Sequence, residues 1–509
     1  MKKHYFAKKV LQACLLFLIT MTTNMSAQVG IGTITPHASS VLDVSSTNQG
    51  MLTPRMTTSQ RTAIVTPADG LIVYDTDLKS FYHYNSTTVS WNRISSDANG
   101  RLKFKRIKST DVLATVLAAE KTLGGNITYK LDPGTLYEIN GAVVLDLPIE
   151  LNNAYIAGLD SGEDKLVKVS GDLFTGTTGG SVRVLTLVAS GGNVFNITAV
   201  GTQNLILRDG IIANSANVGL IKGFSLVFVS IIQYVGNSNG IIYENIEKLL
   251  INNAGWFGGA LPLGNSGTYE KIVGTFGQVA KQGGFSEVTG TSIGFDVFSD
   301  PTITGDAVME SVVFTGAVSG AGAYVKPYTV GSYSGYNFNN SWNVRCAGIP
   351  TEGDSFATGN LYDSNNTSSS RTTATNVSQD YKVITNATAS SNLYRVAANS
   401  TGRLTYLGKK GRIFNVNASV SFKESSGATG NTNYVFYLVK IGTNGTTVTP
   451  LQATETFIDT NSGFVQSFPI SGTVQLNTNE SVEIYLKRIT NPTSPKISID
   501  VYSLNISMN

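Results

Sequence analysis

Apolar, strand-like segments recur through the middle of this chain at a nearly constant interval. One inward-facing position can be chosen in each segment so that neighbouring positions lie 19 to 23 residues apart. A fixed period of this kind is typical of a solenoid, in which each coil buries its apolar face only when the next coil stacks on it. The chosen positions are Leu145, Leu166, Leu185, Leu205, Leu226, Leu249, Ile272, Ile293 and Val312.

The composition of these segments favours strands over helices. Cores such as LTLV, LILR and LVFV are rich in leucine, β-branched and aromatic residues, and glycine, asparagine, serine and aspartate separate them. A leucine-rich repeat has a similar period, but its L-x-x-L-x-L-x-x-N/C spacing is absent here. We therefore predict a parallel β-helix over residues 125–350, with Leu205, Leu226, Leu249 and Ile272 stacked in one interior column.

The amino terminus has the three parts of a secretory signal peptide. Four lysines within the first nine residues precede an apolar core over residues 10–21, and the small residues Ser26 and Ala27 follow. We expect residues 1–27 to be removed after Ala27, which predicts a secreted or cell-surface protein. The other long apolar stretch, 224–235, is shorter than a membrane-spanning helix and follows the repeat, so we expect no transmembrane segment in the mature chain.

Composition narrows the functional classes. Charged residues make up 14% of the chain and the net charge is only +3, which argues against a nucleic-acid-binding protein. After removal of the signal peptide Cys346 is the single remaining cysteine, so no internal disulfide is possible. Stability is then expected to come from packing and assembly.

Two segments precede the predicted β-helix. In the leader, 28–100, short extended pieces alternate with proline and glycine, and segments 70–75 and 81–84 form a hairpin-like pair closed by Trp91. Residues 101–124 contain a predicted helix over 110–121, with Thr110 or Asp111 at its start. This helix has two possible roles, as a neck between chains or as a cap on the open end of the solenoid.

The carboxyl-terminal part has a different pattern. Residues 351–377 are polar and small, which predicts a linker. From residue 378 to 509 longer alternating strands are separated by glycine, asparagine and proline turns, which indicates an antiparallel jelly roll or β-sandwich. The predicted fold class is thus all-β, a parallel β-helix solenoid followed by an antiparallel jelly-roll domain.

Three segments resemble known families. The leader motif VGIGTITPHASSVLDVSSTNQG…GLIVYDTD resembles the leader of secreted, fibre-like proteins of flavobacterial type. The β-helix resembles the shafts of phage tail spikes and tail fibres in architecture. Segments 402–406 (GRLTY) and 472–477 (GTVQLN) are similar to the trimeric jelly-roll knobs of the tumour-necrosis-factor and complement type. This last resemblance implies a homotrimer.

Catalytic signals are sparse. The segment GNSNG at 236–240 matches G-x-S-x-G, but the mature chain has only His37 and His83, both in the leader, so we read it as an Asn-Gly turn and assign no catalytic triad. The same scarcity of histidine and cysteine argues against a zinc site, and Asp75 with Asp77 supplies too few carboxylates for calcium. We predict no cofactor and no metal.

Paired carboxylates leave one enzymatic alternative open. A glycoside hydrolase needs two carboxyl groups a few ångströms apart. The weak candidates are Asp296, Asp300, Asp306 and Glu310, because stacking of neighbouring rungs could bring two of them together.

Exposed aromatic residues are the candidates for ligand binding. Trp256 and Phe257 lie among glycines and asparagines, and Trp342 lies among asparagines. An indole beside amides can stack on a sugar ring while the amides bond its hydroxyls. The alternative is that these side chains cover the solenoid or pack between subunits.

These features predict a secreted or cell-surface, fibre-like binding or adhesion protein directed at a glycan or another cell-surface ligand. One alternative is a β-helical polysaccharide hydrolase or lyase. Another is a structural spacer that displays the carboxyl-terminal knob.

Overall fold

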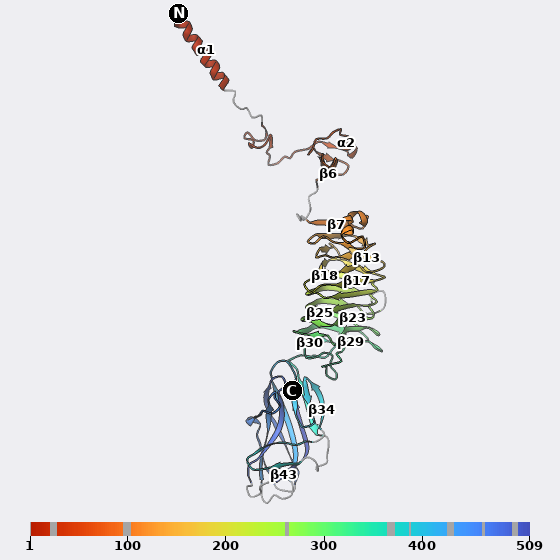
Figure 1. Ribbon diagram of the computed structural model, residues 1–509, viewed down its shortest axis with the longest axis vertical. Helices are drawn as coiled ribbons and strands as arrows, with labels where there is room; N and C mark the ends of the chain where they lie inside the picture. Colours follow the sequence, from red (N-terminus) through yellow and green to blue (C-terminus); the bar gives the residue numbers. More distant parts are fainter. Residues whose placement is uncertain are drawn as a thin grey trace. The chain divides into compact units, whose positions relative to one another are not determined.

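The computed structural model describes residues 2–20, 28–94, 103–259, 264–363, 372–385, 388–424, 432–460, 464–490 and 497–509. The chain divides into two compact units, one up to Leu102 and one from Lys103 to Asn509 (Figure 1). The predicted cleavage site at Ala27 and part of the predicted linker lie outside the described residues. Helix α1 (Lys2–Thr20) covers most of the predicted signal peptide. Among the described residues, no helix is both long and apolar enough to cross a membrane.

Parallel strands stack as coils in the first part of the second unit, drawn from orange to green in Figure 1. One sheet of 13 strands contains β7 (Phe104–Lys108), β9 (Leu136–Asn140), β10 (Ala142–Val144), β12 (Tyr155–Ala157), β13 (Lys165–Lys168), β15 (Gly180–Arg183), β16 (Thr186–Ala189), β18 (Asn204–Ala213), β20 (Leu226–Val235), β22 (Lys248–Trp256), β25 (Gln278–Glu287), β28 (Ala307–Thr315) and β30 (Trp342–Ala347). A sheet of nine strands contains β8 (Tyr129–Lys130), β11 (Ile149–Glu150), β14 (Phe174–Gly176), β17 (Asn193–Thr198), β19 (Asn217–Lys222), β21 (Ile241–Glu244), β23 (Thr268–Val273), β26 (Ile293–Asp296) and β29 (Ala323–Lys326). Strands β24 (Thr275–Phe276) and β27 (Thr302–Ile303) pair with each other. The predicted parallel β-helix is confirmed.

A column of left-handed residues bends the longest strands. Each of β18, β20, β22, β25 and β28 has one interior residue with φ between 51° and 65°, and regular pairing is interrupted there in all four strand pairs of this series. Such a residue turns the chain, so that one strand contributes to two faces of the coil. The residues are Asp209, Ile231, Asn253, Gly283 and Ser311.

The interior column differs in part from the predicted one. Leu205, Val227 and Leu249 lie in register on neighbouring coils and are fully buried. Leu226 instead precedes Val227 and is half-buried, and Ile272 lies inside the tube but on β23, in the other sheet. The predicted column is therefore wrong at two positions. A shift of one residue in a strand moves the side chain to the opposite face, and a sequence period does not resolve that shift.

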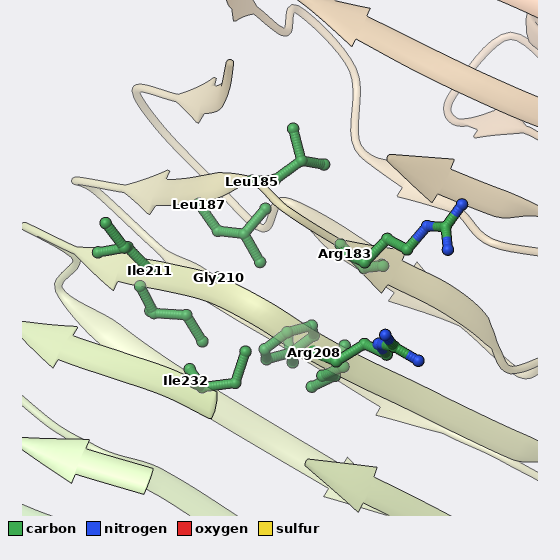
Figure 2. A pocket seen from close by; sticks show the side chains of 11 residues that line it. Arg183, Leu185, Leu187, Arg208, Gly210, Ile211 and Ile232 are labelled. Carbon is green, nitrogen blue, oxygen red and sulfur yellow. The ribbon is translucent and has the colours of Figure 1, made fainter. Parts of the chain in front are cut away.

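The interior of the β-helix is closely packed. Between β15, β16 and β18 a void of ≈ 10 Å³ is lined mainly by aliphatic side chains, among them Leu185, Leu187, Ile211 and Ile232 (Figure 2). This is at most about the space of one water molecule, and apolar walls give water few hydrogen-bond partners. At this level the tube is a core and not a channel.

One ion pair is buried in this core. The Nζ atom of Lys281 lies 2.6 Å from Oε2 of Glu270, and each side chain is 1% exposed. Lys281 is in register between Ile251 and Met309, and Glu270 comes from the facing sheet. A single buried ion of this kind costs several kcal/mol unless it is paired, so neither residue is replaceable by itself.

Short helices close the first coil. In place of the single predicted helix there are α3 (Leu113–Val116) and α4 (Ala118–Leu123), with Leu117 buried in the β-helix core between them. The Oε1 atom of Glu120 accepts hydrogen bonds from Lys105 Nζ at 2.5 Å and from the Tyr137 hydroxyl at 2.8 Å. These contacts agree with the cap and not with an exposed neck. The parallel ladder also begins earlier than residue 125, because β7 pairs with β9.

The first unit contains the leader. A parallel pair, β1 (Val29–Ile31) and β2 (Leu42–Val44), precedes a four-stranded sheet in the order β3 (Arg55–Met56), β4 (Ile72–Asp75), β5 (Ser80–Asn85) and β6 (Ser90–Arg93). The predicted hairpin and its closure by Trp91 are confirmed, since β4 pairs with β5 and Tyr84 pairs with Trp91 on β6.

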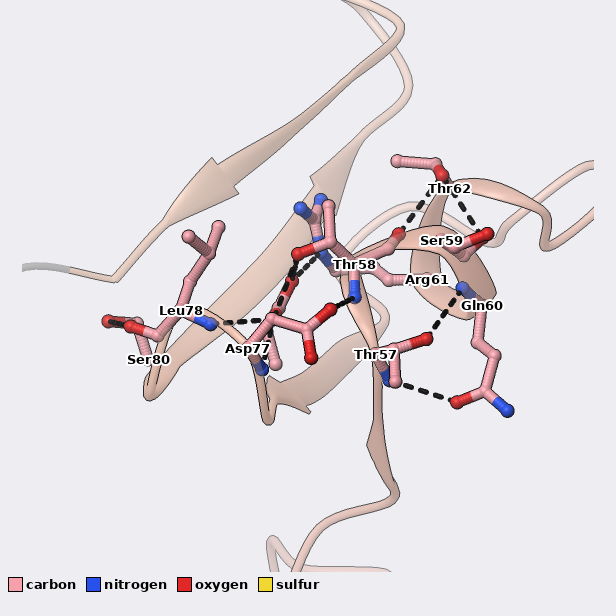
Figure 3. A network of polar contacts seen from close by, with 10 residues as sticks. Thr57, Thr58, Ser59, Gln60, Arg61, Thr62, Asp77, Leu78 and Ser80 are labelled. Atoms are coloured by element: carbon pink, nitrogen blue, oxygen red, sulfur yellow. Dashed lines mark hydrogen bonds and ion pairs between the residues drawn. The ribbon is translucent and has the colours of Figure 1, made fainter.

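Helix α2 (Thr58–Thr62) covers one face of this sheet. The Nε atom of Arg61 lies 2.9 Å from Oδ2 of Asp75, and Thr58 donates to the same carboxylate (Figure 3). The backbone N–H groups of Asp77 and Leu78 donate to its other oxygen at 3.0 Å. Asp75 is thus the centre of a local network that joins α2 to the turn after β4.

The carboxyl-terminal strands are antiparallel, which confirms the predicted sandwich. One sheet contains β31 (Thr358–Asp363), β32 (Thr372–Thr375), β34 (Thr388–Tyr394), β37 (Arg412–Glu424), β41 (Gln466–Leu476) and β43 (Ile497–Met508). The other contains β33 (Asp380–Lys382), β35 (Val396–Ala398), β36 (Leu404–Tyr406), β38 (Thr432–Ile441), β39 (Val448–Pro450), β40 (Thr456–Thr460) and β42 (Ser481–Arg488). Strands β31 and β32 fall inside the predicted linker. These residues form strands because both segments pair with β43 from the far end of the chain.

Candidate ligand-binding clefts

Trp256 does not present an exposed indole. It ends strand β22, is fully buried, and stacks on Tyr234 with ring centres 3.8 Å apart and on Tyr269 with ring centres 5.1 Å apart. Its register partner on the preceding coil is Tyr234, so both side chains point into the tube. The expectation of an exposed Trp256 is therefore wrong, because the glycines beside it belong to the coil's corner and do not open its interior.

The other two aromatic candidates also pack against neighbours. Trp342 is fully buried, and its Nε1 atom donates to the Tyr328 hydroxyl at 3.0 Å. Phe257 is partly exposed and packs edge-on against Phe285, with ring centres 5.0 Å apart. Only Phe257 of the three retains a surface that a ligand could contact.

The four candidate carboxylates lie on one coil and are not stacked on one another. Asp296 is in register between Lys271 and Lys326, and Glu310 between Gln282 and Arg345. Stacking therefore places cations or an amide beside these two groups, where a hydrolase would need a second carboxyl group.

The remaining two carboxylates have structural contacts. Asp306 is exposed, with Oδ1 3.8 Å from Nζ of Lys409. Asp300 accepts hydrogen bonds from the Thr329 side chain and from the backbone N–H groups of Thr329 and Val330, and these bonds lower the pKa of its carboxyl group. Among the described residues, no three His, Cys, Asp or Glu side chains gather closely enough to hold a metal ion.

Glu352 is a buried carboxylate that the sequence analysis missed. It lines a hollow of ≈ 140 Å³ together with Glu310, and burial raises the pKa of its carboxyl group. Its Oε1 and Oε2 atoms accept hydrogen bonds from the backbone N–H groups of Asn337 at 2.7 Å and Phe338 at 2.9 Å. Both oxygens thus hold the loop before β30, which gives this carboxylate a structural role.

A wide open cleft lies where the last coil meets the sandwich, and we call it the junction cleft. It encloses ≈ 980 Å³, within the upper range of small-molecule sites of about 300 to 1,000 Å³. Two elements supply most of its lining, the loop before β30 and strand β34. The lining residues are Ser332, Tyr333, Ser334, Gly335, Tyr336, Pro350, Phe356, Thr358, Ser390, Ser391, Asn392 and Leu393.

Three aromatic side chains of the junction cleft rest on one buried ring. Tyr336 stacks on Tyr394 with ring centres 4.1 Å apart, Phe356 stacks on it at 5.5 Å, and Tyr333 packs edge-on at 5.3 Å. Tyr394 is buried and Phe356 is 42% exposed. Burial raises the pKa of the Tyr336 and Tyr333 hydroxyls, so both phenols stay protonated near neutral pH and can donate hydrogen bonds. The cleft combines aromatic surface with hydroxyl and amide groups.

The walls of the junction cleft are fixed by a buried arginine. Arg395 is 1% exposed, donates through Nη2 to the Trp342 carbonyl oxygen at 2.7 Å, and forms an ion pair with Asp354. Asn340 adds a bond from Nδ2 to the Leu407 carbonyl oxygen at 2.8 Å. Residues before and after the predicted linker are thereby held together.

A second, smaller groove lies on the nine-stranded sheet, and we call it the amide groove. It encloses ≈ 360 Å³. Asn193 and Asn217 are in register on neighbouring coils, and Asn239 donates to Oδ1 of Asn217 at 3.0 Å. The groove is lined by Asn193, Asn196, Asn217, Gly219, Leu220, Asn239, Gly240, Ile242, Thr268 and Lys271. The amides already bond one another in part, and no aromatic ring lines this groove, so we rank it second.

Comparison with known proteins finds a family match in the leader. Residues 30–110 match the family model described as a phage tail like trimerisation region. No curated protein matches the chain. Residues 30–110 thus support a homotrimeric, fibre-like structural protein, whereas the resemblance to flavobacterial leaders finds no support.

Solved structures show only distant likeness. Eiger TNF from S. frugiperda aligns with a TM-score of 0.21 and 8% identity, over 30% of this chain and 94% of that chain. ORF18 of Geobacillus virus E2 aligns with a TM-score of 0.17 and 10% identity, over 58% of this chain and 75% of that chain. Neither alignment transfers a function.

Proposed function

We propose that this protein is a secreted or cell-surface homotrimeric fibre that binds a glycan in the junction cleft. The observation that supports a glycan ligand is the set of aromatic rings beside hydroxyl and amide groups in that cleft. A sugar presents apolar C–H faces that stack on rings and hydroxyls that bond amides and hydroxyl groups. Tyr336 and Phe356 supply the rings, and Asn392 on β34 also lines the cleft.

The proposed function is the one that the sequence predicts, but the proposed site is the junction cleft and not the surface around Trp256 and Trp342. The fibre is supported by the trimerisation-region match and by the stacked coils of the β-helix. Secretion rests on the signal-peptide pattern of the first 27 residues. Mature protein in the culture medium beginning at Gln28 is the expected result for secretion, and an intact amino terminus retained in the cell would contradict it.

A glycan array tests the ligand. The full mature chain is labelled and compared with the Tyr336→Ala variant. Since a stacked ring contributes about 1 kcal/mol beyond its burial, the variant should bind the same glycans at least several-fold more weakly. Tyr155→Ala is the matched control, because Tyr155 is exposed on β12, outside the cleft. Equal binding by wild type and Tyr336→Ala would show that the junction cleft is not the binding site. An array on which the wild type binds nothing would contradict a glycan ligand.

A second assay on the same array distinguishes binding from hydrolysis. Reducing ends are measured after incubation with each glycan that binds. A binding protein leaves their number unchanged. Release by the wild type that is lost in Glu310→Gln would establish the alternative, a polysaccharide-degrading enzyme. A protein that neither binds nor cleaves any glycan would favour the structural spacer.

A further inference from the structure

The four-stranded sheet of the leader has two unlike faces. Side chains alternate along β4 and β5, and register partners lie on the same face. Val73, Asp75 and Tyr82 lie on the face that α2 covers, where the Arg61 guanidinium is 4.0 Å from the centre of the Tyr82 ring. Val73 and Asp75 have almost no exposed surface. This covered face is complete within the chain.

The opposite face is apolar and exposed, and we call it the bare face. Ile72 pairs with His83, and Tyr74 pairs with Phe81. Ile72 is 45% exposed and Phe81 44% exposed, although the rings of Tyr74 and Phe81 contact each other with centres 5.1 Å apart. Large apolar side chains gathered on one sheet face mark a surface that another molecule covers.

The bare face has the composition of a protein interface. Across β3 and β6 the register continues with Arg55 and Asn92, so polar groups border the apolar centre. An apolar centre with a polar border is the usual anatomy of a protein interface. No carboxylate is found among the register-paired residues of the bare face. A partner therefore meets apolar surface and not a complementary charge pattern.

We propose that the bare face is the surface through which the three copies of this chain contact one another. The inference rests on the homotrimer of the proposed function, and it deepens it by naming the contact. The matched trimerisation region, 30–110, contains the whole four-stranded sheet. In a ring of three, each copy turns the same element toward the common axis, where Ile72, Tyr74 and Phe81 become buried.

Oligomeric state tests the contact. The full mature chain and the double variant Ile72→Ser/Phe81→Ser are compared by sedimentation equilibrium over a range of micromolar concentrations. Both side chains are exposed in the single chain, so the variant should fold. It should shift from trimer to monomer, with the half-dissociation concentration raised at least tenfold. Val65→Ser is the control, since Val65 is 85% exposed elsewhere in the same unit and should leave the trimer unchanged.

The outcomes are distinguishable. A wild-type monomer would overturn the homotrimer of the proposed function and this contact with it. A double variant that stays trimeric to the same dilution would overturn the bare face alone, and would point to the carboxyl-terminal sandwich as the assembly contact. If the double variant loses the circular dichroism of the wild type, it has not folded, and the cross-linking experiment below then tests the contact.

Cysteine cross-linking gives a readout that does not depend on dissociation. In a Cys346→Ser background, Phe81→Cys should form a covalent dimer under mild oxidation, because like residues meet near the axis. Val65→Cys in the same background should not. Equal cross-linking of the two variants at equal concentration would contradict the bare-face contact.

Discussion

Ile231 occupies a backbone conformation that suits asparagine or glycine better. It is half exposed, has φ +55°, and stands at the bend of β20 where the neighbouring coils have Asp209 and Asn253. A β-branched residue in the left-handed region costs about 1 to 2 kcal/mol. Ile231→Asn should therefore raise the free energy of unfolding by about 1 kcal/mol, measured by urea denaturation. Asn253→Ile should lower it by a similar amount, and a loss of stability in Ile231→Asn would contradict the strain.

Asp75 should make the leader sensitive to acid. Burial raises the pKa of its carboxyl group, but the Leu78 N–H, Arg61 and Thr58 outweigh burial and hold the pKa below its usual range. A lowered pKa in the folded state stabilises the fold above the unfolded value and loses that contribution as the pH falls below about 4. Hydrogen exchange in β4 and β5, corrected for intrinsic rates, should therefore accelerate steeply in acid.

The variants Asp75→Asn and Asp77→Asn separate this effect from general acid unfolding. Asp75→Asn should exchange faster at neutral pH and show a shallower acid response. Asp77 is exposed in the same turn and accepts one hydrogen bond, from the Thr58 backbone N–H at 2.9 Å, which the amide oxygen of Asp77→Asn can still accept, so this variant serves as the milder comparison. An unchanged acid response in Asp75→Asn would show that another group controls it.

At the scale of the element, a strand of the β-helix is defined by which of two neighbours points inward. Val227 is fully buried in register with Leu205 and Leu249, whereas Leu226 beside it is half-buried. Val227→Asp would bury an unpaired charge at a cost of several kcal/mol and should prevent folding of the β-helix. Leu226→Asp should retain the far-ultraviolet circular dichroism of the wild type. The reverse order of stability would contradict the observed register.

At the scale of the whole molecule, we predict that Arg395 couples the unfolding of the β-helix to that of the sandwich. Its guanidinium is buried against the Trp342 carbonyl oxygen and paired with Asp354, both of which precede the sandwich. Removing one partner of a buried pair costs about 3 to 5 kcal/mol. We expect Arg395→Ala to split a single calorimetric transition into two, with the sandwich melting first. Lys409→Ala, at a looser surface pair of 3.8 Å, should leave the transition unchanged.

The candidate site that residue type predicts lies at the tryptophans, whereas the junction cleft is lined by other residues. The sequence points to Trp256 and Trp342 because glycine and asparagine surround them, yet both are buried in the core. Tyr336 and Phe356 lie in unremarkable loop sequence and form a cleft only because Tyr394, far along the chain, packs beneath them. No local pattern records a contact between segments so distant.

By itself, the sequence determined the β-helix and the sandwich, because each rests on local regularities: apolar strands that recur along the chain and stack as coils, and an alternation of two that makes strands. The recurrence is less regular than the sequence predicts, since the register partners Leu205 and Val227 are 22 residues apart (227 − 205) and Lys248 and Gln278 are 30 apart (278 − 248). It also supplied the hairpin of the leader. Only the tertiary structure decided which side of each strand is interior, that Lys281 meets Glu270, and that the predicted linker pairs with β43. These depend on a one-residue register or on partners distant in sequence, and neither leaves a periodic trace along the chain.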